Sequence, residues 1–113
     1  MAKARRGSAK ALTKRSKGAA KRLFFQDICL GEITEVYGES HWMSGTLWPT
    51  PESASFRDFF RWMVDENNAS LDPPFDEALL DEDNWFIEQE DGVKVGISLP
   101  AVQPDSEIGW RWR

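Results

Sequence analysis

Alternation of apolar and polar side chains is strongest in residues 84–99, on either side of a glycine-containing turn. A two-residue turn at Asp91-Gly92 would bring acidic residues of one strand beside valines of the other, whereas a three-residue loop over 90–92 pairs Gln89 with Val93. We prefer the second register because it gathers the apolar residues on one face, and a one-residue slip would scatter them. It predicts a β-hairpin whose inner face holds Trp85, Ile87, Val93, Val95 and Ile97.

Three further segments have the composition of β-strands. Residues 23–37 are rich in β-branched and aromatic side chains, and we expect a break or bulge at Gly31. Residues 42–48 predict a second strand, which the intervening turn residues join to the first as an antiparallel hairpin. Residues 107–113 predict a final strand, because alternate positions are apolar: Ile108, Trp110 and Trp112.

Helical spacing is clearest after the second strand. Apolar residues recur at intervals of three and four, which predicts one stripe facing a core: Phe56, Phe59, Phe60, Met63 and Val64. Ser55 is the expected N-cap of this helix, and Asn67 and Asn68 are expected to mark its end. A short second helix is expected to begin with Asp72 as its N-cap and to run to about Leu80.

These elements predict an α+β fold in the order β-β-α-(α)-β-β-β. We expect a small antiparallel sheet of about four to five strands, with one main helix packed on one face. A chain of 113 residues favours one domain. We assign residues 23–113 to a single acidic α+β domain and residues 1–22 to a disordered basic arm.

Charge is divided between these two parts of the chain. Residues 1–22 hold nine bases and no acid, whereas residues 23–113 hold five bases and all 19 acidic residues. Every Trp, Phe and Tyr also lies in residues 23–113. The arm has too little apolar surface to fold alone, so we expect it to be disordered when free.

A flexible cationic arm binds nucleic acid through its phosphates, without sequence preference. The expected contacts are Lys3, Arg5, Arg6, Lys10, Lys14, Arg15, Lys17, Lys21 and Arg22. Two alternatives remain open. The arm can lie on its own acidic domain or on an acidic protein partner, or it can have no specific role.

No catalytic, metal-binding or cofactor-binding motif emerges. His41 is the only histidine and Cys29 the only cysteine, too few for a zinc site, and no orienting group marks either as catalytic. The acidic run 81–83 continues into apolar strand residues, so it does not match a calcium loop. We expect no cofactor, no metal and no enzyme activity. A lone cysteine and the absence of a long apolar stretch favour a cytoplasmic protein without membrane contact.

The main hypothesis is therefore a non-catalytic protein-interaction module that binds a basic protein, in the manner of an immunity or antitoxin-like inhibitor. Carboxylates and partly exposed tryptophans would form its surface. The predicted partner-binding residues are Trp42, Trp48, Trp62, Asp65, Glu66, Asp81, Glu82, Asp83, Glu88 and Glu90. The alternatives are a nucleic-acid-associated protein tethered by its arm and a carboxylate-dependent enzyme.

Overall fold

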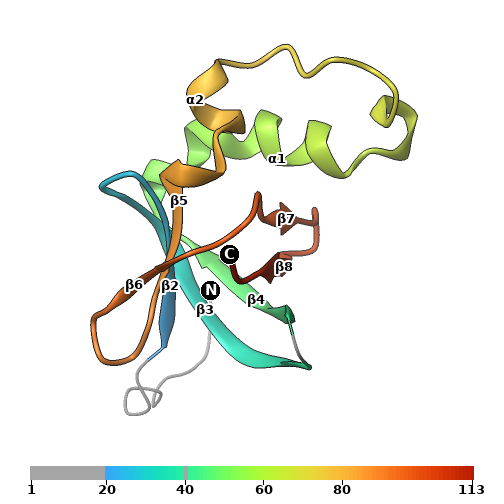
Figure 1. The fold of residues 1–113 in the computed structure, drawn as a ribbon. Coiled ribbons are helices and arrows are strands. Elements are labelled where there is room, and N and C mark those ends of the chain that lie inside the picture. The colour runs from blue at the N-terminus through green and yellow to red at the C-terminus, as the bar shows by residue number, and fades with distance from the viewer. Residues whose placement is uncertain (1–19, 40) are drawn as a thin grey trace.

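The computed structural model describes residues 20–39 and 41–113, so most of the predicted arm lies outside the described residues. The described part has the predicted α+β class (Figure 1). Its strands are β2 (Lys21–Phe25), β3 (Ile28–Glu39), β4 (Trp42–Pro49), β5 (Trp85–Glu88), β6 (Lys94–Gly96), β7 (Ala101–Val102) and β8 (Glu107–Arg111). Its α-helices are α1 (Arg57–Val64) and α2 (Glu77–Leu80), and its short 3-10 helices are η2 (Pro51–Phe56), η3 (Glu66–Asn68) and η4 (Glu82–Asn84).

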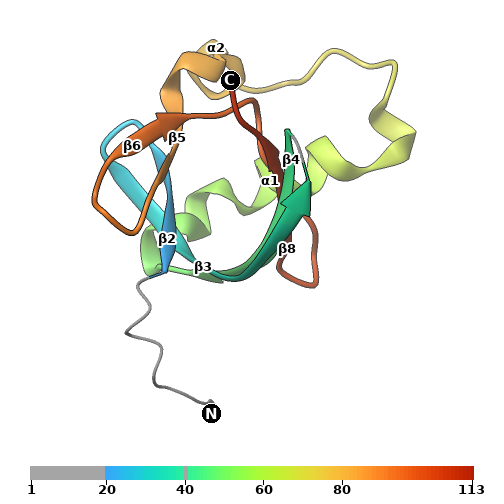
Figure 2. The same ribbon diagram turned by 60° about the horizontal axis from the view of Figure 1, so that its bottom comes forward.

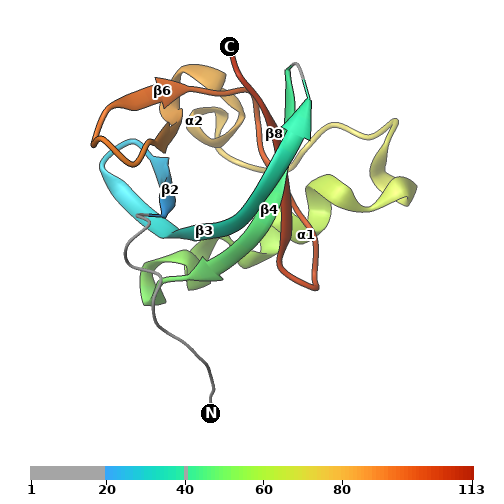
Figure 3. The ribbon, with the colours of Figure 1, turned by 90° about the horizontal axis from the view of Figure 1, so that it is seen from below.

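Within the described residues, one antiparallel sheet of seven strands has the order β6-β5-β2-β3-β4-β8-β7. The sheet curls strongly, so that its strands surround a common interior when seen from below (Figures 2 and 3). The helix α1 lies across the upper end of this curled sheet (Figure 1). The buried side chains therefore fill the space that the sheet encloses and the region beneath α1.

The sheet is larger than the expected four to five strands, for two reasons. The predicted single strand 23–37 is in fact a hairpin of β2 and β3, and its turn at Gln26 and Asp27 divides the apolar run. Gln26 has a φ of 52°, a left-handed conformation for which its sequence gives little signal. The expected bulge is present, because the register between β2 and β3 shifts beside Gly31. The short strand β7, which also pairs with β8, was not expected between two prolines.

The predicted hairpin over residues 84–99 is confirmed in its register. The backbone N–H of Gln89 donates to the carbonyl of Val93 at 2.8 Å, and Gly92 has the left-handed φ of 86° that the three-residue loop requires. Ile87 is fully buried as expected. Val93 is the exception, because it lies beyond the core and is 56% exposed.

The main helix has the predicted apolar stripe but a different beginning. Phe56, Phe59 and Phe60 are buried, as the periodicity predicts. Ser55 is not the N-cap: the chain enters a 3-10 turn at Pro51 and continues into α1, and the Ser55 hydroxyl donates to the carbonyl of Glu52 instead. Pro51 suits this position because its missing N–H would be unpaired there in any case.

The second helix also begins later than expected. Its N-cap is Asp76, whose carboxylate accepts a hydrogen bond from the N–H of Ala78 at 2.9 Å, and not Asp72. Both aspartates satisfy the residue preference of an N-cap, so the pattern alone could not choose between them.

The curled sheet is joined to itself near the end of β8. Ile97, which follows β6, pairs with Trp112, and the N–H of Arg113 donates to the carbonyl of Gly96 at 3.1 Å. The Arg113 side chain extends this junction, donating from Nε to the carbonyl of Ile97 at 2.7 Å and from Nη2 to that of Trp85 at 3.1 Å. A side chain at Gly96 would overlap the Arg113 guanidinium, so glycine there leaves the space that the arginine occupies.

Replacing Arg113 with Ala should lower the free energy of unfolding by about 2–3 kcal/mol, because two carbonyl oxygens lose a charged donor. Urea unfolding followed by tryptophan fluorescence measures this change. The matched control is Arg111→Ala, since Arg111 is exposed and lies 5.7 Å above the Trp42 ring. The Arg111→Ala substitution should lower the free energy of unfolding by less than about 1 kcal/mol. Equal losses in the two variants would show that closure of the sheet does not depend on Arg113.

Candidate functional site

Residues 65–84 form an acidic surface segment, which we call the acidic segment. It holds eight acidic residues and no base, and all eight are exposed: Asp65, Glu66, Asp72, Asp76, Glu77, Asp81, Glu82 and Asp83. Across the described part of the chain, only one of the eight forms an ion pair, Asp83 with Arg113 at 3.5 Å. Five of the predicted partner-binding acids therefore lie in one stretch of largely uncompensated negative charge.

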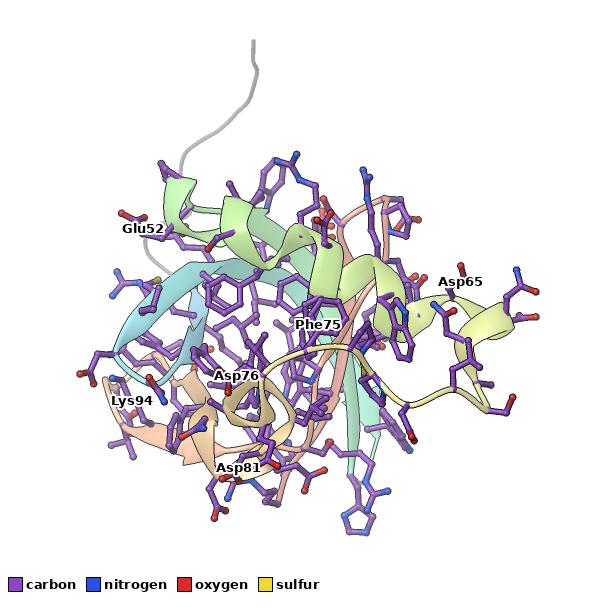
Figure 4. The ribbon with its side chains drawn as sticks, turned by 90° about the horizontal axis from the view of Figure 1, so that it is seen from above. Glu52, Asp65, Phe75, Asp76, Asp81 and Lys94 are labelled. Atoms are coloured by element: carbon purple, nitrogen blue, oxygen red, sulfur yellow. The ribbon has the colours of Figure 1, made fainter. Side chains whose placement is uncertain are left out.

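The acidic segment is held in place by its apolar residues and its turns. The Phe75 ring packs edge-on against Phe59, with 5.3 Å between ring centroids, and lies 6.0 Å from the Trp62 ring. Figure 4 shows Phe75 beside α1, with Asp65 beyond the end of that helix and with Asp76 and Asp81 on the side of Phe75 away from α1. Packing of Phe75 thus leaves the carboxylates on the outside.

Short hydrogen bonds fix three of these carboxylates at the start of helical turns. Asp65, Asp76 and Asp81 each accept a hydrogen bond of 2.9 Å from the backbone N–H two residues further on. One carboxylate oxygen is sufficient for this bond, so the group keeps lone pairs for an incoming cation. The turns therefore orient negative charge before a partner arrives.

The predicted tryptophans do not lie together. Trp42 and Trp48 are on the outer face of β4 and are 59% and 49% exposed. They share this face, as expected for two residues an even number of positions apart in one strand. Trp62 is partly buried and contacts Phe75 of the acidic segment. The structure thus separates Trp62, which belongs with the acidic segment, from the two tryptophans of β4.

Tyr37 joins Trp42 and Trp48 on what we call the outer sheet face, and the sequence pattern missed it. Its side chain is 62% exposed, and its hydroxyl donates to Glu107 at 3.4 Å. A bulge in β3 between Thr34 and Tyr37 changes the alternation, which places these two residues on the same side although three positions separate them. No local sequence signal marks this bulge, where Glu35 has a φ of 55°.

Glu88 and Glu90 lie away from the acidic segment and bind the chain's own bases. Lys21 Nζ is 3.1 Å from Glu90 Oε1, and Arg22 Nη1 is 3.1 Å from Glu88 Oε1. Lys21 and Arg22 belong to β2, so these two predicted arm residues are part of the sheet. The other predicted nucleic-acid contacts, from Lys3 to Lys17, lie outside the described residues.

Nothing in the described residues arranges groups for metal-dependent chemistry. No cluster of three or more His, Cys, Asp or Glu side chains that could hold a metal ion occurs there. His41 is exposed and Cys29 is partly buried in β3. None of the described helices is long and apolar enough to cross a membrane.

Comparisons with protein-family models, with curated proteins and with solved structures found no match.

The ion pair between Lys21 and Glu90 should make stability depend on acidity. The pKa of Glu90 lies below its ordinary value of 4.5, first because the carboxylate accepts its own backbone N–H and second because Lys21 donates to it. A carboxyl group with a lowered pKa in the folded state stabilises that state at neutral pH, and this contribution disappears as the pH falls through the folded pKa.

Glu90→Gln should therefore reduce stability at pH 7 by less than about 1 kcal/mol, since the Glu90 side chain is about half exposed. The difference between wild type and variant should shrink as the pH is lowered from neutral through the folded-state pKa of Glu90. Urea unfolding across this range measures it, with Glu82→Gln as a control at an exposed acid without an ion pair in the described structure. A difference that persists at low pH would contradict this role of Glu90.

Proposed function

We propose that this protein is a non-catalytic interaction module that binds a basic protein through its acidic segment. The observation that carries the proposal is the concentration of eight exposed acids in residues 65–84, with no base among them and one ion pair in the described structure. Such a surface attracts a cationic partner over several ångströms and speeds its encounter.

The acidic segment supports this function better than the other predicted residues do. Glu88 and Glu90 are already neutralised by bases of the same sheet. The acidic segment also offers an apolar contact, because Leu71 is 56% exposed, and protein interfaces combine such contacts with a polar rim. Charge would therefore bring the partner to the surface, and the apolar residue would add to its retention.

One concrete form of the proposal is an immunity- or antitoxin-like inhibitor. In that form, the carboxylates of the acidic segment would cover a cationic active site, such as that of a nuclease, and keep its anionic substrate away. The basic arm would then have a separate role, and nucleic acid is its expected ligand. A deletion that tests the arm should end at residue 19, because removing Lys21 and Arg22 would shorten β2 and break two ion pairs.

The proposal predicts that position, and not net charge alone, determines binding. In a segment variant, Asp65, Glu66, Asp81 and Glu82 are replaced by the corresponding amides. Asn still accepts the turn hydrogen bonds of positions 65 and 81, so the local structure should survive. Binding of a Lys- and Arg-rich peptide, and of a panel of basic proteins, is measured by calorimetry. The segment variant should bind about 10–100-fold more weakly than wild type.

The matched control removes the same amount of charge elsewhere. Asp27, Glu52, Asp58 and Asp91 are exposed and lie outside the acidic segment, and Figure 4 shows Glu52 at the opposite end of the helical layer from Asp65. Their amide variant should bind within about 3-fold of wild type, a factor that corresponds to long-range attraction alone. The proposal is wrong if both variants lose affinity equally, or if wild type binds none of the cationic probes.

A further inference from the structure

A pocket of about 150 Å³ lies between α1, the end of β4 and the turn that joins β7 to β8. Its walls are apolar where Leu47, Phe60 and Val102 line it, and Arg57 and Arg61 of α1 complete its lining. A cavity of this volume accommodates one benzene ring. The pocket therefore combines room for a small apolar group with a source of positive charge.

Arg57 and Arg61 have no ion pair within the described structure. Lys94 and Arg111 have none there either, but those two lie over aromatic rings. Neither guanidinium group of the two α1 arginines forms an ion pair or a hydrogen bond within the described structure, although their own helix carries Asp58 and is followed by Asp65. The two α1 arginines are one helical turn apart, a spacing at which like charges repel each other. Two guanidinium groups on one side of a pocket form a site for a carboxylate or a phosphate, which arginine binds through two parallel hydrogen bonds.

The turn opposite α1 adds a second observation. Ser106 lines the pocket and has a φ of 76°, in the left-handed region that favours glycine. Backbone bonds hold it there: its N–H donates to the carbonyl of Gln103 at 2.9 Å, and its own carbonyl accepts the N–H of Leu47 at 2.8 Å. The chain thus keeps a hydroxyl-bearing residue at a strained position in the lining of the same pocket, and such strain is concentrated at functional sites.

We propose that this pocket binds a small amphipathic anion, namely a carboxylate attached to a ring or to a short branched apolar group. The carboxylate pairs with Arg57 and Arg61, and the apolar group enters between Phe60 and Val102. This site lies on residues other than those of the acidic segment, so it is independent of the proposed protein-binding function. Its ligand has the opposite charge to the partner of the acidic segment.

The test uses the full chain labelled with nitrogen-15 and benzoate as the probe. Titration should produce saturable NMR shifts at residues 57–61 and 103–106, with a dissociation constant on the order of 1 mM. Benzamide, which has the same ring without the charge, should bind at least about 10-fold more weakly. Arg57→Gln and Arg61→Gln should each weaken benzoate binding about 10-fold, and Ser106→Gly about 2-fold to 3-fold.

Arg111→Gln provides the matched control, because Arg111 is an exposed arginine of β8 that does not line the pocket. It should change benzoate binding less than about 2-fold, and the unchanged spectrum of each variant away from the substitution shows that it is folded. Equal binding of benzamide and benzoate, an equal effect of Arg111→Gln, or no saturable shift at these residues would each overturn the proposal.

A second arm of the experiment identifies the source of the carboxylate. A short peptide ending in Phe is titrated with a free C-terminal carboxylate and, separately, with a C-terminal amide. If the peptide with the free carboxylate binds more tightly than benzoate, the pocket is assigned to the C-terminal end of a polypeptide. The amidated peptide should then bind about 10-fold more weakly than the peptide with the free carboxylate. Tighter binding of benzoate assigns the pocket to a free small molecule.

Discussion

The packing of Trp85 connects the three parts of this domain. Its side chain is fully buried and contacts Phe25 of β2 and Phe59 of α1, at centroid distances of 5.0 and 5.9 Å. Its indole N–H donates to the carbonyl of Leu79 at 2.9 Å, within the acidic segment. A single residue thus joins the sheet, the main helix and the acidic segment, and a Trp→Ala change at such a site costs about 3–5 kcal/mol.

This arrangement explains how a small domain can present so much negative charge. Two contacts anchor the acidic segment: the Phe75 ring packs against Phe59, and the Leu79 carbonyl accepts the indole N–H of Trp85. The apolar burial at these contacts offsets the electrostatic repulsion among the carboxylates. A disordered acidic stretch would lose conformational freedom on binding, whereas an ordered one has already lost most of it. The fold therefore prepares the acidic segment for association.

Prediction from the sequence succeeded where periodicity and turn chemistry agree. The spacing of apolar residues predicted the buried stripe that contains Phe56 and Phe59. The need for a left-handed residue in the three-residue loop predicted the conformation of Gly92. Prediction failed where backbone geometry departed from residue preference. Gln26 and Glu35 adopt positive φ angles without being glycine. For this reason the sequence did not predict the β2–β3 turn at Gln26 or the β3 bulge at Glu35 that exposes Tyr37.

The candidate sites were predictable in composition but not in position. Charge counts indicated an acidic surface, yet only the sheet pairing shows that Glu88 and Glu90 face Arg22 and Lys21. The pairing of distant strands is set by the whole fold, so local sequence carries no signal for it. The same is true of the pocket, because its lining comes from residues on α1, β4 and the β7–β8 turn.

The most direct test of the central claim maps where a cationic partner binds. Nitrogen-15-labelled full-length protein is titrated with a Lys- and Arg-rich peptide at about 50 mM and about 200 mM salt, and backbone NMR shifts are recorded. The account predicts that the largest shifts fall within residues 65–84, and that they weaken as salt rises. Shifts concentrated at Trp42 and Trp48 on the outer sheet face, with the acidic segment unchanged, would contradict it.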